Sequence, residues 1–340
     1  MNISCRLLIL LVWAAGGCWS APPPDGSLTA LIVFGDSLSD AGNISAESAI
    51  VPQPPYHGGR FSNGDIWVEL FARHFGLEAR PSYLGGTNYA QGASGTGRGL
   101  ANYGGLPLGP NVREQVLLYR GRPLGTELFI VWGGANDVFD VLAGACEMTP
   151  AQMADNVYLA VAMLYERGGR QFLVPNLPDI GLAPRYRDGE RASMATQLSG
   201  DFNAHLAARL DQLGSLSGIR IYRLDVWALF NAAIADPPPG VTNLTEPAWS
   251  GSFLGYLGGG ELVADPDEYL FWDSVHPTRV SHGLIAAVAI DLVESSFTPP
   301  VQRPEPAGLS GIALPPPIDF WLTYFSLLSQ PSDAPDECRY

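Results

Sequence analysis

Residues 29–37 read TALIVFGDS, a run of apolar and β-branched side chains that ends at Gly35, Asp36 and Ser37. A run of this kind, bounded by turn residues, is typical of a buried strand that leads directly into a tight turn. The turn places the hydroxyl of Ser37 just beyond the strand. Such a serine commonly caps a helix or closes a turn, but it is a nucleophile if a base lies within reach. Residues 29–37 alone are consistent with both hypotheses.

Strands and helices alternate along the chain after this first strand. Three further buried strands are predicted from apolar runs that end in turn residues: 127–137, 170–176 and 219–225. Four helices are predicted from apolar residues at helical spacing: 65–76, 149–168, 191–213 and 279–295. The alternation and the short connections predict one doubly wound α/β domain over residues 28–296, a three-layer α/β/α architecture with a parallel sheet in the middle.

The first twenty residues have the pattern of a secretory signal peptide. Arg6 precedes an apolar stretch over 7–15, and small residues then lead into a proline-rich exit. A second interpretation takes AAGGC, which ends at Cys18, as a loose bacterial lipobox that makes Cys18 a lipid anchor. Both interpretations predict an exported protein, either secreted or held in the periplasm or at the cell surface, with residues 1–20 as its leader.

Two stretches depart from the strand and helix alternation. Residues 236–270 are rich in Pro and Gly and too long for a plain connection, so we expect a surface excursion beside the site. Together with residues 44–60, this excursion is expected to form the walls of the substrate pocket. Residues 297–340 are a proline-rich tail with one apolar run too short to span a bilayer, and we assign it no role.

The composition excludes several classes of protein. With 340 residues, 46% of them hydrophobic, the chain can bury a large core. A formal net charge of -15 and a pI near 4.6 argue against a nucleic-acid partner, since phosphate contacts need clustered Lys and Arg. Beyond the leader no run reaches the ~20 apolar residues of a membrane span. Cys146 and Cys338 allow one disulfide bridge but form no metal-ligand spacing. We expect a monomer.

Ligands bind outside the carboxyl ends of the strands in a doubly wound sheet. The ends of the predicted strands carry chemical groups that complement one another. Four blocks stand there or close by: GDS at 35–37, NYAQGASG at 88–95, GGAND at 133–137 and DSVHP at 273–277. His276 is the candidate base for Ser37, and Asp273 can orient its imidazole. The Asn136 amide, the Gly92 N–H and the Ser37 N–H are candidate donors for an oxyanion hole.

Other hydrolase and binding motifs do not fit. The G-x-S-x-G elbow of α/β-hydrolases is absent, and GTGRG at 95–99 lacks the spacing of a dinucleotide loop. A two-metal phosphoesterase needs more histidines and carboxylates than these blocks offer.

The four blocks, in this order between residues 34 and 277, resemble the GDSL esterases and lipases, also called SGNH hydrolases. GRFSNGDIWVELFA at 59–72 is similar to the secreted bacterial and plant branch of that family. The resemblance implies a flavodoxin-like sheet of about five parallel strands and requires no metal or cofactor. It implies the following site residues: Ser37 as nucleophile, Gly92 and Asn136 as oxyanion donors, and Asp273 with His276 as the supporting pair. One departure is Ala93, where many relatives have a second glycine.

The expected function is that of a secreted serine esterase or lipase, which hydrolyses small or lipid carboxylic esters through an acyl-enzyme. An acyltransferase or a carbohydrate acetylesterase would use the same site. A rival hypothesis from another class is a catalytically silent protein that binds glycans or lipids through exposed aromatic residues: Trp249, Phe253, Tyr256 and Tyr269. Glycosylation at Asn43 or Asn243 is left open.

Overall fold

The computed structural model describes residues 28–48, 51–103 and 106–297. The predicted leader, Cys18, Cys338 and the tail after Phe297 lie outside the described residues, so the predictions made for them stay predictions. Cys146 is disulfide-bonded. Within the described ranges, no helix is both long enough and apolar enough to cross a bilayer.

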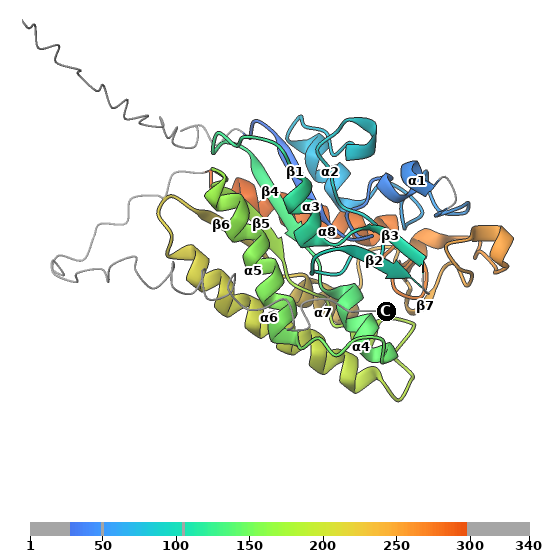
Figure 1. Ribbon diagram of the computed structural model, residues 1–340. Helices are drawn as coiled ribbons and strands as arrows, with labels where there is room; N and C mark the ends of the chain where they lie inside the picture. Colours follow the sequence, from blue (N-terminus) through green and yellow to red (C-terminus); the bar gives the residue numbers. More distant parts are fainter. Residues whose placement is uncertain (1–27, 49–50, 104–105, 298–340) are drawn as a thin grey trace, which may run out of the picture.

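A parallel four-stranded sheet forms the centre of the fold (Figure 1). Its strands lie in the order β1 (Leu31–Gly35), β4 (Leu128–Trp132), β5 (Gln171–Pro175) and β6 (Arg220–Leu224). β1, β4 and β5 are buried along their whole length, as expected for apolar runs covered on both faces. All four strands predicted from the apolar runs are confirmed.

A fifth segment lies along the free edge of β1. Val33 N–H donates to Thr87 O at 3.0 Å, and Tyr89 N–H donates to Val33 O at 2.7 Å. Only one bridge, between Val33 and Asn88, has strand geometry, so this polar segment does not form a regular strand. Counting it, the order around β1 is that of a flavodoxin-like doubly wound sheet, and the α/β three-layer prediction is confirmed.

Helices cover both faces of the sheet and complete two hydrophobic clusters. On one face lie α2 (Trp67–His74), α7 (Val226–Ala235) and α8 (Arg279–Glu294). On the other lie α3 (Val112–Leu118), α4 (Ala135–Ala143), α5 (Pro150–Glu166) and α6 (Ala192–Gly214). The four predicted helices correspond to α2, α5, α6 and α8. The capping box of α5 joins Thr149 and Gln152 as its sequence indicates.

Shorter elements surround the mouth of the sheet. They are α1 (Asn43–Ser48), an antiparallel pair β2 (Leu100–Tyr103) and β3 (Leu106–Pro110), and a parallel pair β7 (Asn243–Pro247) and β8 (Tyr269–Phe271). Four single turns of 3-10 helix, η1 to η4, cover Ser82–Leu84, Ile180–Leu182, Gly255–Gly258 and Pro266–Glu268. A third cluster of buried side chains, outside the two beside the sheet, contains Tyr56, Phe61, Trp249 and Trp272. This cluster packs against the site described next.

Candidate active site

The turn after β1 is fixed by the neighbouring strand and by one amide side chain. A Cβ atom at Gly35 would lie 2.7 Å from the carbonyl oxygen of Trp132, so the strand pairing leaves room only for glycine. The Gln115 side chain accepts from Gly35 N–H at 2.9 Å and donates to Gly35 O at 2.8 Å. These contacts determine where the chain leaves the sheet and therefore where Ser37 lies.

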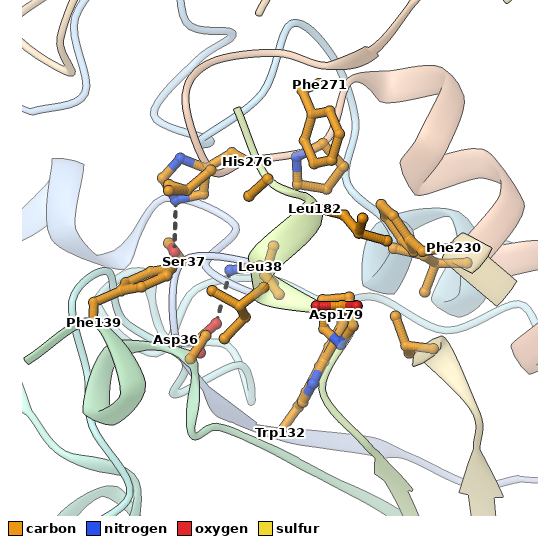
Figure 2. Close-up of a pocket in the computed structure, with 18 of the residues that line it drawn as sticks. Asp36, Ser37, Leu38, Trp132, Phe139, Asp179, Leu182, Phe230, Phe271 and His276 are labelled. Carbon is orange, nitrogen blue, oxygen red and sulfur yellow. Dashed lines mark hydrogen bonds between the residues drawn. The ribbon is translucent and has the colours of Figure 1, made fainter. Parts of the chain in front are cut away.

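The imidazole of His276 joins Ser37 to Asp273. His276 Nε2 lies 2.8 Å from Ser37 Oγ (Figure 2), and Nδ1 lies 2.8 Å from Asp273 Oδ2. Asp273 Oδ1 accepts from the backbone N–H groups of Val275 at 2.9 Å and His276 at 2.8 Å. With Nδ1–H donated to the carboxylate, Nε2 is left to accept the proton of the serine hydroxyl. A serine hydrogen-bonded to an oriented base is the arrangement that activates a nucleophile.

Asp273 is buried, yet it is held in its ionised form. Burial alone would raise its pKa. The charge of His276 and the hydrogen bonds from His276, Val275 and Tyr56 outweigh that effect and hold the pKa of Asp273 below its usual value. An ionised carboxylate at this distance from an imidazole favours the protonated form of the ring.

Two aromatic residues that the sequence did not single out complete the surroundings of His276. Tyr56 O–H donates to Asp273 Oδ2 at 2.7 Å, on the same oxygen that faces the imidazole. Phe61 stacks on the His276 ring, with ring centroids 5.0 Å apart and an interplanar angle of 30°. Both come from the loop before α2. The one sequence signal for them is the aromatic content of the stretch PPYHGGRFSNG, which contains both residues.

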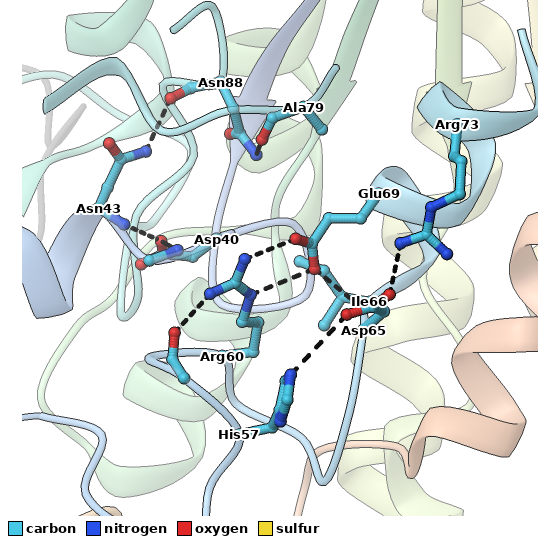
Figure 3. Close-up of polar contacts among 12 residues, drawn as sticks. Asp40, Asn43, His57, Arg60, Asp65, Ile66, Glu69, Arg73, Ala79 and Asn88 are labelled. Carbon is cyan, nitrogen blue, oxygen red and sulfur yellow. Dashed lines mark hydrogen bonds and ion pairs between the residues drawn. The ribbon is translucent and has the colours of Figure 1, made fainter. Parts of the chain in front are cut away.

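The loop that carries Tyr56 and Phe61 is attached to α2 by ion pairs (Figure 3). The Arg60 guanidinium binds both carboxylate oxygens of Glu69, at 2.6 and 3.2 Å. His57 is exposed and faces Asp65 at 3.8 Å, and Arg73 binds the other oxygen of Asp65. His57 therefore points to the α2 side of the loop.

The acidic residue three positions after Ser37 organises the start of α1 (Figure 3). Asp40 accepts from the backbone N–H groups of Gly42, Asn43 and Ile44. Its Oδ2 also accepts from Gly92 N–H at 2.9 Å. Burial raises the pKa of Asp40 to about 6, against the lowering effect of these hydrogen bonds. Asp40 is thus a scaffold residue that ties the Ser37 turn to the 88–95 block.

Asn43 joins the same two blocks and is closed to modification in the folded protein. Its Nδ2 donates to Asn88 O at 2.7 Å and to Ala90 O at 2.8 Å, and the side chain is buried. An amide nitrogen that makes both bonds in the interior has no room for a glycan. Asn243 is half-buried in β7, and its Oδ1 accepts from backbone N–H groups.

Asn136, the predicted oxyanion donor after β4, lies near Ser37, and its predicted role stays a prediction. It is the second residue of α4, which follows β4 after two glycines, and it lines the same pocket as Ser37. Its Nδ2 donates to Ser94 O at 3.0 Å, which uses one of its two N–H bonds. The second N–H is of the kind that can stabilise negative charge developing beside Ser37.

Gly92 is near the site, but its N–H is engaged elsewhere. That N–H donates to Asp40, so in this structure it does not face an oxyanion. The residue must still be glycine, because a Cβ would lie 2.6 Å from the ring of Phe61. The next residue, Ala93, has a φ of 66°, a left-handed conformation that favours glycine. The predicted role of Gly92 as an oxyanion donor stays a prediction.

Two further buried carboxyl groups flank the site. Asp36 Oδ1 accepts from Leu38 N–H at 3.0 Å, whereas Oδ2 meets no donor among the described residues. Burial raises the pKa of Asp36 to about 6. Asp137, next to Asn136, accepts from the Thr96 N–H and hydroxyl, and burial raises its pKa to about 7. Both groups become easier to protonate because the interior disfavours their charge.

An apolar pocket opens beside Ser37 and His276 and extends toward Phe230 (Figure 2). It follows the carboxyl ends of β1, β4, β5 and β6 and is partly open to solvent. None of the described residues in 44–60 or 236–270 lines it, so the expectation about the pocket walls was wrong for this pocket. The walls come instead from η2, from α7 and from the turns after the strands, because those segments follow the strand ends directly.

A protein-family model matches most of this chain. The model of the GDSL-like lipase/acylhydrolase family matches residues 31–288, which includes all four blocks and most of the chain. The chain belongs to that family. It is accordingly a carboxylic ester hydrolase.

Relatives of this GDSL family member include an acyltransferase and an esterase. The phosphatidylcholine-sterol acyltransferase of Aeromonas hydrophila is 25% identical over 316 residues, which cover 78% of this chain and 90% of that protein. Esterase EstA of Pseudomonas aeruginosa is 30% identical over 82% of this chain, but the match spans only 48% of EstA. Among solved structures, the carbohydrate acetylesterase Est24 from Sinorhizobium meliloti has a TM-score of 0.44 and 13% identity, over 78% of this chain and 97% of that one.

Proposed function

We propose that this GDSL hydrolase cleaves carboxylic esters with Ser37 as nucleophile, His276 as general base and acid, and Asp273 as the carboxylate that orients His276. The observation that carries the proposal is the continuous chain of two 2.8 Å hydrogen bonds from Ser37 Oγ through the imidazole to Asp273. A three-member arrangement of this kind activates serine on many unrelated folds.

The reaction begins when Ser37 Oγ attacks the ester carbonyl carbon while its proton passes to His276 Nε2. The carbonyl oxygen becomes an oxyanion, which accepts from Ser37 N–H and the free N–H of Asn136. Gly92 N–H joins them only if its bond to Asp40 opens. His276 then protonates the leaving alcohol, and an acyl-enzyme remains on Ser37. A water molecule attacks the acyl-enzyme with the same proton transfers in reverse and releases the acid.

An alcohol that replaces water in the last step would turn the same site into an acyltransferase. The name of the Aeromonas hydrophila relative favours this second activity. The leader pattern at residues 1–20 supports action outside the cytoplasm, on substrates that an exported enzyme meets.

Hydrolysis of p-nitrophenyl butyrate by Ser37→Ala tests the proposal. Loss of the nucleophile should lower kcat by roughly 10⁶-fold. Ser193→Ala, at an exposed position on α6, is the matched control and should retain wild-type turnover. Turnover by Ser37→Ala at a rate near that of the control would exclude Ser37 as the nucleophile.

A further inference from the structure

The pocket beside Ser37 has a reactive end and a far end that lies at α7. Ser37, His276 and Asn136 line the first. Phe230 of α7 lines the far side in Figure 2, and it is buried with its ring 6.3 Å from that of Phe271. Leu182 of η2 lies between the two ends and is only half-buried. An apolar pocket that starts at the nucleophile suits the part of the substrate that stays attached to Ser37 after the alcohol has left.

Apart from the His276 imidazole, the ionisable side chains that line the pocket in the described structure are carboxyl groups. Asp36 and Asp179 line the pocket, whereas no Lys or Arg lines it among the residues that the structure describes. Asp179 is held in place because its Oδ1 accepts from Gly181 N–H at 2.9 Å and from the Thr196 hydroxyl at 2.7 Å. The remaining wall is predominantly aliphatic and aromatic, including Leu38 and Phe139. Such a wall favours an apolar chain and repels a second negative charge.

We propose that this pocket binds the acyl chain of the ester, that Leu182 and Phe230 set the length of chain it accepts, and that Asp179 excludes acyl chains with a terminal carboxylate. The proposal rests on the ester hydrolase function proposed above. The pocket then accepts uncharged acyl chains, and the alcohol part of the ester lies outside the pocket.

Acyl-chain selectivity of two wall variants tests the length rule. Leu182→Trp fills the middle of the pocket. Each methylene group of the acyl chain that is no longer buried in an apolar pocket lowers kcat/KM by about fourfold. If two methylene groups are displaced, the octanoate-to-acetate ratio of kcat/KM for p-nitrophenyl esters should fall by roughly 15-fold. Phe230→Leu enlarges the far end of the pocket and should raise the laurate-to-butyrate ratio. Leu118→Trp, at an exposed site on α3 away from the pocket, is the matched control and should leave both ratios unchanged.

Asp179→Asn tests the charge rule, because the amide oxygen can still accept from Gly181 and Thr196. The substrate pair is the mono-p-nitrophenyl ester of suberic acid, which carries a terminal carboxylate, and p-nitrophenyl octanoate. The variant should raise the suberate-to-octanoate ratio of kcat/KM at least severalfold. An unchanged ratio would overturn the role of Asp179.

The remaining outcomes separate this proposal from the proposed function. If the wild type hydrolyses none of the esters, the function fails. If it hydrolyses them but the acyl-chain ratios of Leu182→Trp and Phe230→Leu equal those of the control, the acyl pocket fails alone. A change in the dependence on alcohol length, measured with acetate esters of increasing alcohol size, would place the alcohol in the pocket and overturn the proposal. Melting temperatures of all variants show whether each remains folded.

Discussion

Replacing Tyr56 by Phe removes one hydroxyl and keeps the ring in its cluster. The hydroxyl donates at 2.7 Å to Asp273 Oδ2, and Tyr56 and Asp273 are 4% and 5% exposed. A buried hydrogen bond to a charged group contributes about 1.5 to 3 kcal/mol, so we expect the free energy of unfolding at pH 7 to fall by that amount. Catalysis should suffer less, because two backbone N–H groups still hold Asp273 Oδ1 and the His276 bond remains. The expected loss in kcat/KM is less than roughly tenfold, against roughly 10⁴-fold for Asp273→Asn.

Urea denaturation and ester hydrolysis of the same preparations measure the two effects. Tyr256→Phe is the control, since Tyr256 is exposed and its ring packs on Trp249. The folded pKa of Asp273 is lowered from 3.8, so the stability that Tyr56 adds is present above pH 3.8 and is lost as the pH falls through the folded pKa. Unchanged stability would refute the energetic argument. A kcat/KM as low as that of Asp273→Asn would refute the claim that Tyr56 only positions the carboxylate.

Three further predictions concern the oxyanion donor, a buried carboxyl group and the end of β1. Asn136→Ala should lower kcat by about 10² to 10³-fold with little change in KM, and steady-state kinetics that show an unchanged kcat would remove Asn136 from the site. Burial raises the pKa of Asp137 from 3.8 to about 7, so ionising it in the folded protein costs free energy between these pH values. The free energy of unfolding of the wild type should therefore fall relative to that of Asp137→Asn as the pH rises from 4 to 7, by up to ~1.4 kcal/mol per pH unit. A difference in urea denaturation that does not depend on pH would contradict this. Gly35→Ala places a Cβ 2.7 Å from Trp132 O and should destabilise the fold by about 1 to 3 kcal/mol, whereas an unchanged melting temperature would show that the strand pair can move apart.

Much of the fold could be predicted because apolar runs and helical spacing are local signals. The strands and the helices α2, α5, α6 and α8 each carry their own pattern. α7 was missed because VWALFNAAIA is apolar on most sides and shows no clear periodicity. The hairpin of β2 and β3 was also missed, because its strands are short and β3 (LPLGP) contains glycine and proline. The pairing of β7 with β8 was missed because it joins two segments that are not adjacent in the sequence.

The candidate site could also be predicted from the sequence only in part. Ser37 and Asn136 lie just beyond the ends of the neighbouring parallel strands β1 and β4, so their proximity follows from topology. Tyr56 was not predictable, because its bond to Asp273 spans 217 residues and depends on the path of one loop. The engagement of Gly92 N–H by Asp40 likewise depends on a turn conformation that residue types do not determine.

Covalent labelling with a fluorophosphonate probe tests the central claim most directly. The probe reacts with a serine only when a base and oxyanion donors activate it. Mass spectrometry of the digested protein should find one adduct, on the peptide that contains Ser37, and no adduct after unfolding in urea. His276→Ala should abolish labelling while Ser193→Ala labels normally. An adduct on another serine, or none on the folded wild type, would contradict the assignment of Ser37 as an activated nucleophile.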